Sequence, residues 1–143
     1  MKPHSAPSYR STALLVCLAL VLLSPAAGSV AESEEATILE GEYVWQRSDK
    51  DIKGPLKAVF EPQGENTWSV SFHFTFQSEE HTYKGTATGA LGKGELKGEV
   101  MSDGDEPRPF NFEGAFEDGT FRGEHGAMRN GENRQTGTMI LRP

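Results

Sequence analysis

Few side chains in this sequence have the chemistry for catalysis or metal binding. The only cysteine, Cys17, lies in an N-terminal apolar run that we expect to be removed, so no thiol nucleophile remains afterwards. The spacing of His73 and His81 places them on opposite faces of a sheet, where they cannot share one metal ion with each other. A Ser-His-Asp arrangement with His125 or another histidine stays open, but no G-x-S-x-G motif appears. We predict no catalytic residue, metal site or cofactor.

Carboxylates cluster in one short segment, 103–106, with the sequence Asp-Gly-Asp-Glu. A calcium loop of the EF-hand type needs further oxygen ligands at fixed spacing and a final Glu, and these do not follow. The segment is therefore predicted to be an acidic turn in solvent. The pair Glu79 and Glu80 is likewise interpreted as part of a hydrophilic hairpin loop.

Aromatic residues form the most informative set. Their simplest role is a hydrophobic core, and some of them are also candidates for lining a cup that binds an apolar or aromatic ligand. Trp45, Trp68, Tyr83 and Tyr43 are the predicted ligand-binding residues, because each joins a ring to a hydrogen-bonding tip. The whole set is Tyr43, Trp45, Phe60, Trp68, Phe72, Phe74, Phe76, Tyr83, Phe110, Phe112, Phe116 and Phe121.

The elements that must position these rings are strands. Residues 67–77 alternate apolar and polar side chains over their full length, which is typical of a strand with one dry face. Turn signals such as Asp118-Gly119 and Asn130-Gly131 separate it from similar segments. The predicted strands are 39–47, 56–61, 67–77, 81–90, 94–101, 109–117, 120–127 and 134–141.

Such a series predicts an all-β antiparallel meander of about eight strands. Its expected form is a small closed barrel, and an open sheet or a β-sandwich is the alternative. The predicted register pairs Phe76 with His81, and this sets Phe72 opposite Gly85 and Trp68 opposite Gly89. Rings opposite glycines fill the space that the missing side chains leave, and they favour a coiled sheet.

The first predicted strand contains Gly41-Glu42-Tyr43, with Trp45 two residues later on the same face. This resembles the Gly-X-Trp motif that opens the avidin and lipocalin-type barrels, the calycins, although Tyr stands in the place of Trp. The resemblance implies an arginine of the last strand, Arg142 or Arg134, packed over the first-strand aromatic. No biotin-site or lipocalin loop motif is matched, so the resemblance implies a fold and no particular ligand.

The N-terminal region is predicted to be a cleavable signal peptide, residues 1–31. A basic start, the 11-residue apolar run 13–23 and a series of small residues are its three parts, and the run is shorter than the ~20 residues of a membrane span. Cleavage is expected after Ala31, with Gly28 as the alternative. Residues 32–37 are a predicted flexible acidic tail and 38–143 a single domain, exported to the periplasm or the medium.

Charge narrows the range of partners. All 21 acidic residues but only 12 of the 14 basic ones lie beyond residue 31, so the exported product carries a net charge of −9. Such a charge disfavours nucleic acid and anionic membranes as partners. The favoured function is non-enzymatic binding of a small molecule or peptide in the barrel. The alternatives are a structural or protein-interaction module using a sheet face or edge, and an isomerase or cyclase with a titratable group in its cavity.

Overall fold

A computed structural model of the chain describes residues 35–143. The predicted leader, and residues 32–34 of the predicted tail, lie outside this range. The described part contains eight strands, and the first begins one residue before the predicted domain boundary. Their bounds are β1 Thr37–Gln46, β2 Asp51–Gly64, β3 Thr67–Phe76, β4 Glu79–Gly89, β5 Gly94–Met101, β6 Pro109–Glu117, β7 Thr120–Arg129 and β8 Glu132–Arg142.

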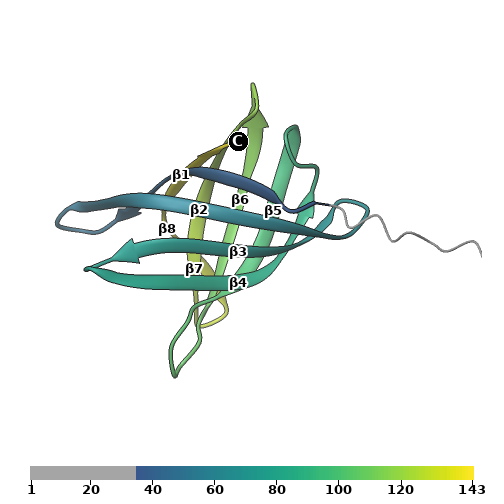
Figure 1. Cartoon of the computed structure of the whole chain (residues 1–143). Coiled ribbons are helices and arrows are strands. Elements are labelled where there is room, and N and C mark those ends of the chain that lie inside the picture. Colours follow the sequence, from purple (N-terminus) through teal and green to yellow (C-terminus); the bar gives the residue numbers. More distant parts are fainter. Residues whose placement is uncertain (1–34) are drawn as a thin grey trace, which may run out of the picture. The chain divides into compact units, whose positions relative to one another are not determined.

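The strands form a closed antiparallel barrel in which each pairs with the next and β8 pairs with β1 (Figure 1). This confirms the all-β meander and the barrel over the open sheet or sandwich. Strand β2 begins at Asp51, five residues before its predicted start. Gly54 and Pro55 concealed this extension, because both residue types are depleted in strands.

The predicted pairing between β3 and β4 is wrong by two residues. The structure pairs Phe74 with His81 and Phe72 with Tyr83. The strands are joined by only Gln77 and Ser78, with φ angles of 51° and 68°, as in a tight hairpin turn of type I′. Neither residue is a strong signal for this turn, so the loop was predicted to be longer. A shift of two residues leaves every side chain on its predicted face.

Rings do lie opposite glycines, but not at the predicted positions. The structure pairs Tyr43 with Gly54, Phe112 with Gly98, and His125 with Gly137. A Cβ atom built on any of these three glycines would come within 2.6–2.9 Å of ring atoms of its partner. Each ring therefore lies directly on the backbone of the neighbouring strand.

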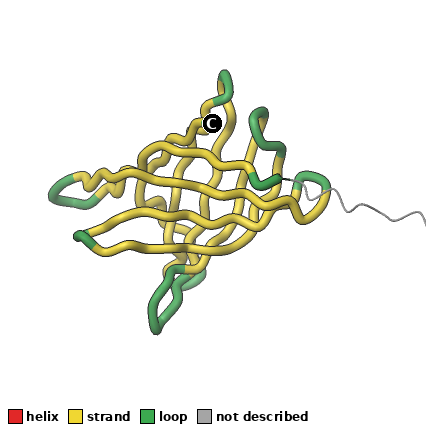
Figure 2. Tube along the Cα trace, viewed as in Figure 1, coloured by secondary structure: helices red, strands yellow, loops and turns green. Residues whose placement is uncertain are grey.

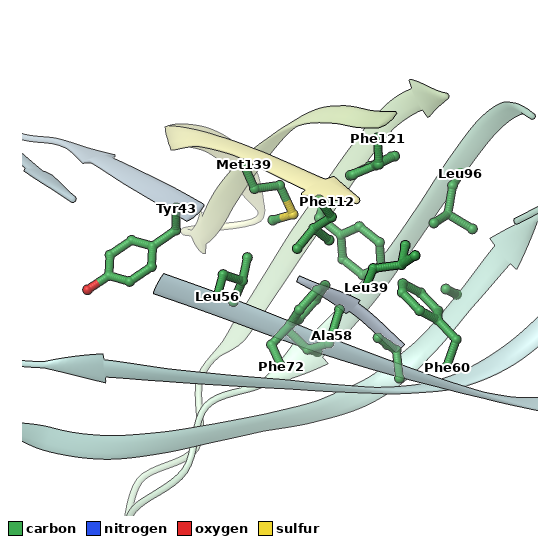
Figure 3. Packing of buried hydrophobic residues seen from close by; sticks show 14 of the residues in the cluster. Leu39, Tyr43, Leu56, Ala58, Phe60, Phe72, Leu96, Phe112, Phe121 and Met139 are labelled. Carbon is green, nitrogen blue, oxygen red and sulfur yellow. The ribbon is translucent and has the colours of Figure 1, made fainter. Parts of the chain in front are cut away.

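The hydrophobic core fills one end of the barrel, near the turns 65–66 and 118–119. Figure 3 shows Phe60, Leu96 and Phe121 toward this end, whereas Tyr43 lies toward the opposite mouth. The largest side chains that are fully buried are Phe60, Val70, Leu96, Phe121 and Leu141. Packing is therefore most complete at the end of the barrel away from Tyr43.

Two of the eight strand pairings are short. The pairings of β4 with β5 and of β8 with β1 each contain six residue pairs, and the other six contain eight to ten. Beyond these short pairings the strands diverge. At the mouth near Tyr43, the β1–β2 and β3–β4 hairpins run to the left in Figure 2, whereas the β5–β6 and β7–β8 connections point downward. The barrel is therefore splayed at the mouth near Tyr43.

Candidate functional site

A cavity of about 70 Å³ lies at the splayed mouth and is partly open to solvent. We call it the cup. Its volume is several-fold below the roughly 300–1,000 Å³ of a site for a drug-sized molecule. The cup therefore accommodates a small group or the end of a larger molecule. Its lining residues are Tyr43, Trp45, Leu56, Phe72, Phe74, Tyr83, Val100, Phe110, Asn111, Phe112, His125 and Met139.

Two of the lining rings lie directly against the backbone of a neighbouring strand. Tyr43 lies on Gly54 and its hydroxyl donates a hydrogen bond of 2.8 Å to the carbonyl oxygen of Thr75, two strands away. Phe112 lies on Gly98 in the same manner. Each ring therefore covers a place where the neighbouring strand has no side chain, and closes the wall there.

Several rings at the mouth, Tyr43 included, form a connected cluster around Phe74. Its ring centroid lies 5.3 Å from that of Tyr43 and 4.9 Å from that of Tyr83, both in edge-on arrangements. His81 stacks on Phe74 at 5.4 Å. Such contacts contribute about 0.5–1.5 kcal/mol each beyond area burial. The cluster therefore holds the rings of β1, β3 and β4 in a fixed arrangement at the mouth.

Three of the four predicted ligand-binding residues, Tyr43, Trp45 and Tyr83, line the cup. Trp68 does not, because it lies near the start of β3 at the opposite end of the barrel. Its indole N–H donates a hydrogen bond of 2.8 Å to the carbonyl oxygen of Gly89. Trp68 shares its face of the sheet with the lining residues, which is why it was predicted with them. Alternation along a strand indicates which face a side chain occupies, but not its height along the barrel axis.

His125 lines the cup and was not among the predicted site residues. Its Nε2 lies 3.1 Å from the carbonyl oxygen of Val44, and its Nδ1 lies 2.9 Å from the hydroxyl oxygen of Thr136. A carbonyl only accepts hydrogen bonds, so Nε2 carries the proton and donates. Burial lowers the pKa of His125, although the bond to Val44 opposes this effect. The glycine opposite, Gly137, is the one sequence signal that could have indicated this position.

A second histidine, His81, links β4 to the predicted acidic turn at the rim of the cup. The Nδ1 of His81 lies 3.0 Å from one carboxylate oxygen of Asp103, and the other oxygen accepts a hydrogen bond of 2.9 Å from the backbone N–H of Thr82. The hydrogen bond from His81 is the main cause that lowers the pKa of Asp103. The predicted acidic turn is thus tied at Asp103 to the edge of β4, next to the cup.

The pKa of Tyr83, another residue at the rim, is also shifted. Burial raises the pKa of its hydroxyl, the carboxylate of Asp103 raises it further, and the guanidinium of Arg108 lowers it. Within residues 35–143, neither the Tyr83 hydroxyl nor the Trp45 indole N–H has a hydrogen-bond partner. These two donors are therefore not used by the barrel itself.

The arginine that the calycin resemblance implies does not lie at the paired position. Met139 is opposite Tyr43, Arg142 is opposite Glu40, and both Arg142 and Arg134 are exposed. Over the described range, no three His, Cys, Asp or Glu side chains gather as ligands for a metal ion. Nor does any segment of residues 35–143 form a helix long and apolar enough to cross a membrane.

Comparison of the chain with protein-family models, with curated proteins and with solved structures gave no match.

Proposed function

We propose that this chain is an exported, non-enzymatic, calycin-like barrel that binds a small apolar or aromatic group in the cup. The observation that carries the proposal is a partly open cavity with aromatic walls in a barrel whose opposite end is filled. Eight-stranded barrels either fill their interior with side chains or keep space for one small ligand. This chain combines the two arrangements, one at each end.

The size of the cup sets the scale of the affinity. Burying about 100 Å² of apolar ligand surface and a similar area of the wall of the cup provides roughly 5 kcal/mol at 25 cal/mol per Å². The loss of translational and rotational freedom opposes binding. A one-ring fragment is therefore expected to bind with a Kd on the order of 1 mM or weaker. A natural ligand gains affinity by extending beyond the cup over the rim.

The isomerase or cyclase alternative requires a titratable group that faces the cavity with a free atom. His125 faces the cavity, but both of its ring nitrogens are hydrogen-bonded to the barrel itself. General acid–base catalysis needs the group within hydrogen-bond reach of the substrate. His125 would have to leave both partners to act in this way. The Tyr83 hydroxyl is free, but its raised pKa keeps it protonated at neutral pH, so it cannot serve as a base. Both residues therefore favour binding over catalysis.

The interaction-module alternative expects an apolar patch on the outside. The large hydrophobic residues that are exposed within 35–143 are Ile38 and Met101, at 47% and 40%. They lie on β1 and β5, which are not neighbours in the barrel. Exposed apolar residues that are scattered singly are normal on protein surfaces. The cup therefore gives the binding proposal the stronger support.

The test follows the methionine methyl groups by NMR in protein labelled at these positions with carbon-13. Met139 lines the cup, whereas Met101 is exposed on β5 and serves as an internal control. Titration with ethylbenzene is expected to move the Met139 signal and leave the Met101 signal in place. An unchanged Met139 signal up to the solubility limit of ethylbenzene would refute the proposal.

A pair of variants separates binding in the cup from binding elsewhere. Val100→Phe adds a ring to the wall of the cup, whereas Val59→Phe adds the same ring on the outer face of β2, opposite Ile38. Only Val100→Phe is expected to abolish the Met139 response. Denaturation curves verify that both variants are folded, since added bulk costs about 1–3 kcal/mol in a packed site.

A further inference from the structure

The polar atoms around the cup fall into two groups. The Tyr43 hydroxyl and both nitrogens of His125 are hydrogen-bonded to the barrel. Asn111 lies between the inward-facing Phe110 and Phe112, so its side chain is directed outward, where it contacts the sulfur of Met128 at 3.4 Å. Within the described residues, the unpartnered side-chain polar groups on inward-facing lining residues are the Tyr83 hydroxyl and the Trp45 indole N–H. Both can donate, and the indole cannot accept.

The ring of Tyr83 lines the cup, and its hydroxyl lies at the rim, where Asp103 and Arg108 act on it. Its ring is held between Phe74, at 4.9 Å, and Phe110, at 5.3 Å. Ring contacts on two sides restrict the direction of the hydroxyl. The raised pKa of this hydroxyl keeps it protonated at neutral pH, so it remains a donor. A ligand that extends from the cup over the rim covers this donor and leaves it unpaired unless the ligand itself carries an acceptor.

Charge around Tyr83 favours a neutral acceptor. Asp103 raises the pKa of the hydroxyl more than Arg108 lowers it, so the negative charge of Asp103 has the larger effect there. The chain beyond residue 31 carries a net charge of −9, which repels anions at longer range. A carbonyl oxygen satisfies the donor without this repulsion, whereas a carboxylate does not.

We propose that the cup selects a small aromatic or aliphatic group that carries a neutral hydrogen-bond acceptor, a carbonyl above all, and that the Tyr83 hydroxyl donates to it. This inference rests on the proposed function and names its ligand class. Tyr83 is then the residue that determines specificity, and the aromatic walls supply the apolar contact.

The experiment compares two molecules of nearly equal shape, acetophenone and ethylbenzene, which differ by a carbonyl in place of a methylene. Their Kd values are measured from the Met139 methyl signal in the purified wild-type protein and in Tyr83→Phe. Tyr83→Phe is expected to weaken acetophenone binding about threefold to tenfold, the range of one neutral hydrogen bond. Ethylbenzene binding should change less than twofold. Because the change is measured within each ligand, the different water solubilities of the two cancel.

Tyr43→Phe is the matched control. It removes a hydroxyl from the same cup, but one that is already bonded to Thr75. It should affect the two ligands equally. Benzoate, measured alongside, should bind more weakly than acetophenone.

The outcomes separate the inference from the proposed function. If both ligands move the Met139 signal but Tyr83→Phe changes their affinities equally, the inference is wrong and the binding function stands. If benzoate binds more tightly than acetophenone, the choice of a neutral acceptor is wrong. If neither acetophenone nor ethylbenzene moves the signal, the proposed function itself fails.

Discussion

Replacing Gly54 with alanine tests the way in which the wall of the cup is built. The new Cβ would lie 2.7–2.9 Å from three atoms of the Tyr43 side chain, closer than van der Waals contact permits. Tyr43 is only 6% exposed, so its ring has little space into which to move. We expect the ring to be displaced and its hydrogen bond to Thr75 to be strained or lost.

The magnitude follows from three contributions. Overpacking of this kind costs about 1–3 kcal/mol, and the hydrogen bond of Tyr43 contributes about 0.5–1.5 kcal/mol. Replacing glycine with alanine in a strand returns about 0.5–1 kcal/mol, because the unfolded chain loses conformational freedom. Gly54→Ala should therefore lower the free energy of unfolding by about 1–3 kcal/mol.

The assay is urea denaturation followed by circular dichroism, carried out as a double-mutant cycle with Tyr43→Leu. Leucine is too short to cover Gly54, so in that background Gly54→Ala should be neutral or stabilising by up to about 1 kcal/mol. The coupling energy between the two sites should reach at least about 1 kcal/mol. Gly64→Ala is the control, because nothing lies within 4 Å of a Cβ at that position.

A Gly54→Ala protein as stable as the wild type would refute this explanation of the wall. An equal loss of stability from Gly54→Ala with and without the Tyr43→Leu substitution would also refute it. The cost would then come from the backbone and not from the ring. Destabilisation by Gly64→Ala of the same size would show that any added methyl group in this sheet is harmful.

Two further predictions follow from single hydrogen-bonding groups. Trp68→Phe removes the hydrogen bond to Gly89 and should lower the free energy of unfolding by about 0.5–1.5 kcal/mol; because Trp68 lies at the filled end, the response of Met139 to ethylbenzene should be unchanged. The lowered pKa of His125 means that the unfolded chain takes up this proton at a higher pH than the folded chain does. The contribution of His125 to stability should therefore be constant above the ordinary histidine pKa, about 6.5, and fall as the pH drops from there to the lowered value. Urea titrations between pH 5 and 8 should show this slope reduced in His125→Gln, and an unchanged slope would contradict it.

The sequence alone determined the class of fold and the face that most side chains occupy. Period-two alternation in residues 67–77 and the turns at Asp118-Gly119 and Asn130-Gly131 are local signals, and the structure has strands and tight turns at these places. A strand exposes alternate residues to opposite sides whatever its neighbours are. The inward positions of Tyr43, Trp45 and Tyr83 were predictable for this reason. The signal peptide and the export of the product remain predictions from residues 1–31.

Tertiary structure decided the register, the closure and the depth of each residue in the barrel. Register depends on the backbone angles of Gln77 and Ser78, which their residue types do not reveal. Closure joins β1 to β8 near the opposite end of the chain, and no local pattern encodes such a pairing. The position of the His125 ring depends on a hydrogen bond to the carbonyl oxygen of Val44, 81 residues away. The sequence therefore identified rings suited to a ligand. Only the closed barrel separated Trp68, at its filled end, from the rings around the cup. The reason is that the height of a residue along the barrel axis is set by long-range strand pairing.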